Sequence, residues 1–156
     1  PVTGKLFDKF GPRALVIPGA VFLLVIMWFF TRVSVDTSKI TFLVLHICMM
    51  VAISMIMMPT QTNGLNQLPP RYYPHGTAIL NTLQQVAGAI GVAFFIGIMT
   101  SGQNVYLANV PNPTDPAQIA QSTAIGVHNA FLYGFGFAVI AVLLSFFMKR
   151  TKSQQH

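Results

Sequence analysis

The chain has 156 residues, of which 53% are hydrophobic and only 8% are charged. A soluble domain carries about 25% charged residues, so this composition excludes an ordinary soluble globule and predicts lipid as the main solvent. The formal net charge of +6 does not indicate nucleic-acid binding, because the basic residues stand beside the ends of apolar runs instead of along one face.

Four apolar runs divide the chain, each roughly 18 or more residues long and therefore able to cross a hydrocarbon core of about 30 Å. We expect spans at about 14–31, 40–58, 77–99 and 130–148. They predict an all-α membrane protein with four transmembrane helices. The pattern also predicts a cytoplasmic segment over 4–13 and an external loop over 100–127.

The basic residues that flank the spans predict the orientation of the chain. One side collects seven of them: Lys5, Lys9, Arg13, Arg71, Lys149, Arg150 and Lys152. The other side has only Arg32 and Lys39, and the loop over 100–127 has none. By the positive-inside rule both ends of this chain are expected in the cytoplasm, as an even number of spans requires.

The segment before the first span combines glycines, basic residues and one acid: Gly4, Lys5, Asp8, Lys9, Gly11 and Arg13. In a short cytoplasmic turn the acid can pair with a basic residue or a helix end, while the glycines permit close helix approach. We therefore expect Asp8 to stabilise a contact between helices. The alternative, from these residues alone, is an ordinary basic juxtamembrane turn.

The second span is rich in methionine, which suits an adaptable apolar binding surface but also fills gaps in any bundle. From this cluster we take Met55 as a substrate-cavity candidate. His46 in the same span is either a neutral hydrogen-bonded side chain or a proton carrier. Cys48 has no partner in the chain, which excludes an internal disulfide and predicts a small buried thiol.

The third span has a polar face in its first half. Polar and small residues recur there at three-to-four spacing: Thr77, Asn81, Gln84, Gln85 and Gly88. Such a face inside a membrane must meet other helices or water. We take Asn81, Gln84 and Gln85 as further cavity candidates, with structural hydrogen bonding between helices as the alternative.

Small residues in the last two spans predict close helix packing, because they let another helix approach. In the third span they are Gly88, Ala89, Gly91, Ala93 and Gly97. In the fourth span they are Gly126, Ala130, Gly134 and Ala138.

The sequence contains no pattern typical of an enzyme. Its three acids, Asp8, Asp36 and Asp115, all fall outside the apolar runs, so they form no carboxylate pair for acid–base chemistry and no proton relay within the membrane. The four histidines match no metal-ligand spacing. We expect neither a metal nor another cofactor.

Two sequence segments resemble a known transporter family. The segment 4–13 reads GKLFDKFGPR and is similar to the second copy of the cytoplasmic loop motif of the major facilitator superfamily. The segment 68–78 reads LPPRYYPHGTA, followed by NTLQQV at 81–86 and GAIGVA at 88–93. This block resembles the 14-helix drug:proton antiporter branch of EmrB/QacA type, and most of all its lincomycin-resistance transporters of the LmrB type.

The resemblance implies a C-terminal fragment of a longer transporter, since in that family the loop motif lies between the tenth and eleventh helices and this chain begins beside it with Pro1 instead of Met. The four spans would be part of the C-terminal bundle of a major facilitator fold, in a proton-coupled multidrug antiporter of the cytoplasmic membrane. Implied partners are membrane lipid, the N-terminal remainder, a small hydrophobic drug-like substrate and protons. The family's proton-binding acids lie in its first bundle, and no position here matches them. The alternative is an independent four-span scaffold or oligomerisation protein.

Overall fold

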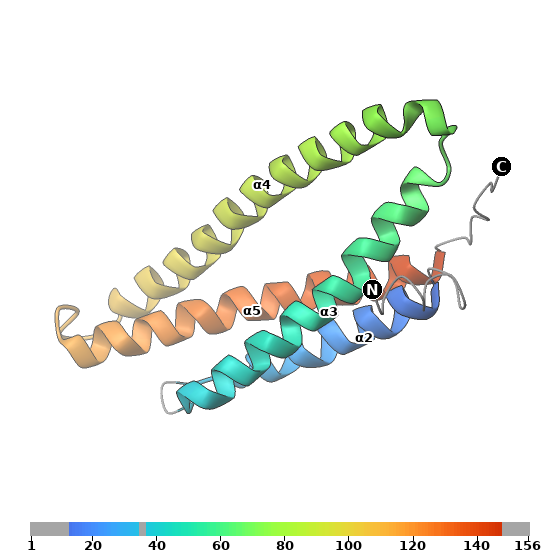
Figure 1. The fold of residues 1–156 in the computed structure, drawn as a ribbon. Helices are drawn as coiled ribbons and strands as arrows, with labels where there is room; N and C mark the ends of the chain where they lie inside the picture. Colours follow the sequence, from blue (N-terminus) through green and yellow to red (C-terminus); the bar gives the residue numbers. More distant parts are fainter. Residues whose placement is uncertain (1–12, 35–36, 148–156) are drawn as a thin grey trace.

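The computed structural model describes residues 13–34 and 37–147 (Figure 1). Its elements are α2 (Arg13–Phe30), α3 (Lys39–Leu65), the short 3-10 helix η1 (Pro70–Tyr72), α4 (Tyr73–Leu107) and α5 (Pro116–Phe147). Within these residues there is no strand, and four helices are long and apolar enough to cross a membrane. The predicted all-α fold with four spanning helices is confirmed.

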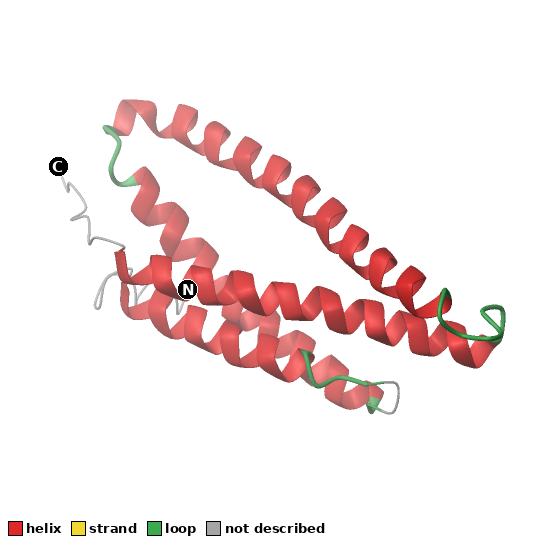
Figure 2. Ribbon diagram, turned by 180° about the vertical axis from the view of Figure 1, so that it is seen from behind, coloured by secondary structure: helices red, strands yellow, loops and turns green. Residues whose placement is uncertain are grey.

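The helices form an open row instead of a closed bundle. Helix α2 packs between α3 and α5, and α5 packs in turn against α4. Helices α3 and α4 follow each other in the chain but touch little, chiefly near their turn, where Gly76 lies against the side chains of Leu65 and Leu68. Figures 1 and 2 show α4 meeting α5 at one end and diverging from it towards the other.

The best-packed region lies where α2, α3 and α5 meet. Ile26, Phe30 and Ala52 are its buried members, and the ring of Phe30 stacks on that of Phe131 with centroids 4.5 Å apart. Because lipid tails are as apolar as these side chains, close van der Waals packing is what holds such helices together. Most other apolar side chains remain exposed on this chain alone.

A glycine permits the tight contact between α2 and α3. A Cβ added at Gly19 would lie 2.9 Å from Cβ of Met55 and 3.2 Å from Cγ1 of Ile56. The hydrogen atom of glycine therefore lets α3 approach the backbone of α2 directly.

Three helices extend beyond the apolar runs that predicted them. Helix α3 continues through the buried Pro59 to Leu65, seven residues beyond the expected end of the second span at 58. Proline is tolerated within a membrane helix when neighbouring groups satisfy the freed carbonyl. Hydropathy reports how much of a helix lipid can accept, so it underestimates helices whose ends are polar.

The connection between α4 and α5 is much shorter than the loop expected over 100–127. Helix α4 runs to Leu107 and α5 begins at Pro116, which leaves 108–115 between them. Pro116 suits a first helical position because its missing N–H needs no partner there. The carboxylate of Asp115 accepts a hydrogen bond from the N–H of Ala117 at 3.0 Å and caps the helix. The loop prediction was wrong in extent because helix capping, not apolarity, determines where α5 begins.

Candidate functional site

The polar face predicted on α4 lines a single groove of about 680 Å³. Its lining consists of Asn81, Gln84, Gln85, Gly88, Ala89 and Val92. Helical spacing brings the three amides together because residues three and four apart share a face. Within the described part of the chain these amides are exposed and make no hydrogen bond. We call this the amide groove.

The amide groove lies on the side of α4 that meets α5 farther along the helix. Eleven residues make about three helical turns, so Gly88 and Met99 lie at nearly the same angle, as do Gln84 and Phe95. The backbone oxygen of Met99 contacts Gly126 of α5, and Phe95 lies near Gly134 of α5. The amides therefore lie on the side of α4 that faces α5, in the part of the helix where α4 and α5 diverge.

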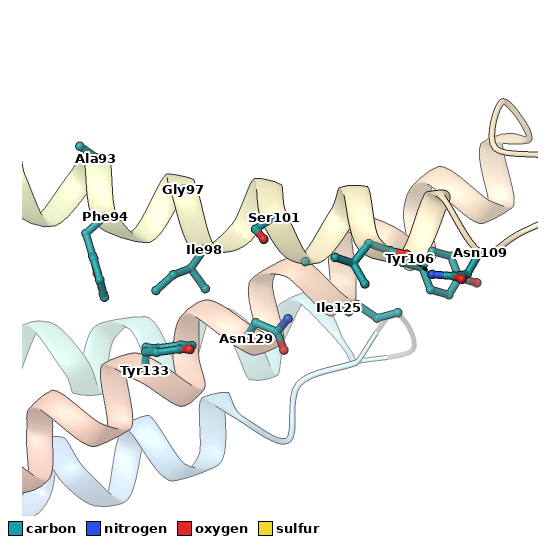
Figure 3. A pocket seen from close by; sticks show the side chains of 12 residues that line it. Ala93, Phe94, Gly97, Ile98, Ser101, Tyr106, Asn109, Ile125, Asn129 and Tyr133 are labelled. Atoms are coloured by element: carbon teal, nitrogen blue, oxygen red, sulfur yellow. Dashed lines mark hydrogen bonds between the residues drawn. The ribbon is translucent and has the colours of Figure 1, made fainter.

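A second groove, of about 790 Å³, lies between α4 and α5 (Figure 3). Phe94 and Ile98 project from α4 towards Asn129 and Tyr133 of α5. The rings of Phe94 and Tyr133 are 6.1 Å apart and nearly perpendicular. Ser101, Asn129 and the hydroxyl of Tyr133 make no hydrogen bond with the described residues. This groove has apolar and aromatic walls with a few neutral polar groups, as small-molecule sites commonly have.

Sequence reasoning missed the α4–α5 groove. Ser101, Tyr106, Asn109 and Ile125 line it from a stretch that was assigned to a loop. Asn129 borders the expected fourth span and Tyr133 lies within it, but neither residue was singled out. A usable signal was present: Val105 and Tyr106 continue the helical spacing from Ile98 beyond the apolar run that ends at 99.

Polar contacts hold α4 and α5 together near their connection. The hydroxyl of Tyr106 donates to Oε1 of Gln118 at 2.7 Å, and Nε2 of Gln103 donates to the hydroxyl of Thr123 at 3.4 Å. Hydrogen bonds between membrane helices average about 0.6 kcal/mol. These bonds therefore orient the two helices more than they stabilise them.

Close packing accompanies these bonds. A Cβ added at Gly126 would overlap the backbone oxygen of Met99 and lie 3.0 Å from Cγ of Gln103. A Cβ added at Gly102, which was not predicted, would lie 2.7 Å from Nδ2 of Asn129 and 3.2 Å from Cα of Gly126. Gly102 and Gly126 thus form the point where α4 crosses α5.

The other predicted small residues differ in their surroundings. Ala138 is buried, Ala130 is half-buried, and a Cβ at Gly134 would make ordinary contacts with Met27 and Phe95. A Cβ at Gly88, Gly91 or Gly97 would meet no atom of the described residues within 4 Å. Close packing by this part of α4 stays a prediction about helices outside this chain.

Met55 does not join the amide groove. Its Cβ lies against Gly19, so on this chain the side chain belongs to the α2–α3 contact. A role for Met55 in a substrate cavity stays a prediction.

Most of the cytoplasmic loop motif, from Gly4 to Gly11, lies outside the described residues. Arg13 is described: its Nη2 donates to the carbonyl oxygen of Phe146 at 2.7 Å. A cation near carbonyls at a helix C-terminus is favourable. This bond joins the beginning of α2 to the end of α5.

The remaining titratable candidates do not form a catalytic or metal centre within the described residues. His46 is exposed, and Cys48 is a half-buried free thiol packed beside the core cluster. In residues 13–34 and 37–147, no three His, Cys, Asp or Glu side chains are grouped to hold a metal ion.

The chain is similar in sequence to known proteins along nearly its whole length. The family model described as Major Facilitator Superfamily matches residues 1–92. The chain is 55% identical to the lincomycin resistance protein LmrB of Bacillus subtilis (strain 168), over 97% of this chain and 32% of that protein. It is 53% identical to a lincomycin resistance protein LmrB of Listeria monocytogenes, with the same coverage.

A more distant relative is the puromycin resistance protein of Streptomyces alboniger, 24% identical over 98% of this chain and 31% of that protein. The chain spans about a third of the length of the curated relatives it matches. No solved structure matches it.

Proposed function

The chain belongs to the major facilitator superfamily, and from this premise we propose that it is the C-terminal part of a proton-coupled multidrug efflux transporter of the cytoplasmic membrane. The observation that carries the proposal is the amide groove on α4, in which Asn81, Gln84 and Gln85 lie on one face of an apolar helix. The high identity over nearly the whole chain favours a transporter over an independent four-span scaffold.

The physical argument concerns what three unpaired amides do inside a membrane. Buried polar groups cost free energy unless they are hydrogen-bonded, whereas a bond between helices gains only about 0.6 kcal/mol on average. Structural hydrogen bonding is thus a weak reason to place three amides on one face. Transporters of this class rock two repeats around a site near the membrane midplane, and a water-filled cavity or a bound substrate would satisfy such amides.

The chemistry of the groove favours a particular kind of substrate. Its polar lining is neutral, with amide donors and acceptors beside Ala89 and Val92. A small, largely apolar molecule with a few hydrogen-bonding groups would fit such a surface. The acids of this chain lie outside its apolar runs, so we assign proton coupling to acids in the N-terminal remainder.

We further propose that both ends of this chain face the cytoplasm. The distribution of Lys and Arg supports this orientation. The hydrogen bond from Arg13 to Phe146 joins the beginning of the first span to the end of the last, which supports a shared side for the two ends.

The test is the substitution Gln85→Leu in the full-length transporter. The loss of one hydrogen bond to a substrate lowers the affinity for that substrate roughly two- to tenfold. The ratio in which two compounds are exported should therefore change by that factor. Export is measured as efflux from cells normalised to the amount of folded protein. The matched control is Thr82→Val, because the Thr82 hydroxyl donates to the carbonyl of Ala78 within α4 and does not line the groove.

The control variant should keep the wild-type substrate profile. If Gln85→Leu instead lowers the amount of folded protein while the profile stays unchanged, the amide groove has a structural role and the site assignment is wrong.

A further inference from the structure

A pocket of about 540 Å³ lies at the turn between α2 and α3, away from both grooves of α4. Its polar members are Arg32, Thr37 and Thr41, and its apolar wall includes Phe29, Ile40 and Val44. We call it the turn pocket. Its apolar wall runs along the first turns of α3 and the last turn of α2, so one end is polar and the other apolar.

Arg32 is held in place by an aromatic ring and not by an acid of the described residues. Its Cζ lies 5.0 Å from the centroid of the Trp28 ring. In the described part of the chain no carboxylate pairs with it. A cation over an aromatic face keeps its N–H donors available while its position is restricted.

Two hydroxyl groups lie in the same pocket. The Thr37 oxygen accepts a hydrogen bond from the N–H of Ser34 at 2.8 Å, and its own O–H donates to no described residue. The Thr41 hydroxyl makes no hydrogen bond with the described residues. A guanidinium and two free O–H groups together offer donors to an anion with several acceptor oxygens, such as a phosphate.

The location of the pocket indicates what carries that anion. Arg32 follows the last residue of α2 and Thr37 precedes α3, so the polar end lies where a span leaves the membrane. Tryptophan such as Trp28 is enriched at that depth. The apolar wall is open, since Phe29 is 49% exposed and Ile40 is 73% exposed. A ligand with an anionic head and an apolar tail fits both parts.

We propose that the turn pocket binds an anionic phospholipid. Its phosphate contacts the guanidinium of Arg32 and the hydroxyls of Thr37 and Thr41, and one acyl chain lies along Phe29, Ile40 and Val44. Basic pockets between transmembrane helices bind acidic head groups on the cytoplasmic side, and the turn pocket offers the same kind of donors at the opposite end of the spans. The site is independent of transport and of the proposed substrate cavity.

The experiment uses the full-length protein in nanodiscs that contain equal amounts of phosphatidylglycerol and phosphatidylethanolamine. Native mass spectrometry after release counts the phosphatidylglycerol molecules that each protein retains. Arg32→Gln should lower the retained phosphatidylglycerol about tenfold. Lys39→Gln is the matched control, because Lys39 is an exposed cation at the start of α3 that does not line the pocket. It should change retention less than about twofold.

Two more variants separate binding from folding. Thr41→Val keeps the shape and every charge but removes one donor, so it should lower retention about two- to fivefold. Arg32→Lys keeps the charge but loses the planar fork of donors, and it should retain less phosphatidylglycerol than the wild type. All variants should melt within a few degrees of the wild type in nanodiscs of phosphatidylcholine alone.

Three results would overturn the proposal. An equal loss of retention in Arg32→Gln and Lys39→Gln would indicate diffuse attraction between charges. Equal retention by the wild type and Arg32→Gln would show that the phosphate of the retained phosphatidylglycerol is not bound by Arg32. The third result concerns Asp36, which lies outside the described residues. If Asp36→Asn and Arg32→Gln lower the melting temperature in phosphatidylcholine equally, Arg32 forms an ion pair with Asp36 and does not bind a lipid phosphate.

Discussion

Single glycines determine how closely the helices of this protein approach. The crossing of α4 and α5 depends on Gly126, whose missing side chain leaves room for the backbone oxygen of Met99. By contrast, Gly136, ten residues along the same helix, has no described atom within 4 Å of an added Cβ. The two glycines therefore form a matched pair with the same helix propensity and different surroundings.

We predict that Gly126→Ala destabilises the full-length protein by about 1–3 kcal/mol, because the new methyl group forces the two backbones apart. The measurement is the free energy of unfolding in mixed micelles during titration with a denaturing detergent. Gly136→Ala should leave stability unchanged or raise it by up to about 1 kcal/mol. Equal effects of the two substitutions would show that the crossing is not tightly packed.

At the scale of elements, α4 and α5 form a hairpin that is longer than its apolar core. Polar residues beyond that core make bonds between the helices, among them Tyr106 with Gln118. We predict that Tyr106→Phe lowers the free energy of unfolding by about 0.5–1.5 kcal/mol. The substitution removes the hydrogen bond that Oε1 of Gln118 accepts from the tyrosine hydroxyl. Thermal unfolding of the purified full-length protein measures the cost.

A second tyrosine on this hairpin provides the control. The Tyr133 hydroxyl makes no hydrogen bond with the described residues, so Tyr133→Phe should leave stability within about 0.5 kcal/mol of the wild type. If both variants melt at the wild-type temperature, the contact of Tyr106 with Gln118 does not contribute to the stability of the hairpin.

At the scale of the whole molecule, the open row of helices leaves α4 exposed along most of its length. An isolated α4 would expose three unpaired amides to lipid, which costs free energy. In a transporter of the length of its relatives, other helices would cover this side. We therefore expect helices outside this chain to complete the amide groove.

Orientation is tested at the same scale. With Cys48 replaced by Ala, we predict that a cysteine introduced at Asn112, in the turn between α4 and α5, reacts with a membrane-impermeant thiol reagent in intact cells. A cysteine at Ser153, which lies outside the described residues, should react only after permeabilisation. Labelling of the Ser153 variant in intact cells would contradict the cytoplasmic location that we propose for the ends of this chain.

Several features of this protein follow from the sequence alone. Lipid cannot hydrogen-bond backbone groups, so an apolar run of sufficient length must form a helix, and four such runs predicted α2 to α5. The amide groove was also predictable, because Asn81, Gln84 and Gln85 lie close together in one helix and the period of the helix places them on one face.

Only the tertiary structure decided which helices pack together and where the α4–α5 groove and the turn pocket lie. Hydropathy reports the solvent of each segment but not its neighbour, so the position of α2 between α3 and α5 was not predictable. Some contacts join residues that are far apart in the chain. Met55 lies against Gly19, and Phe94 faces Tyr133 across the α4–α5 groove. Such contacts depend on the matching shapes of two surfaces, which no local sequence pattern records.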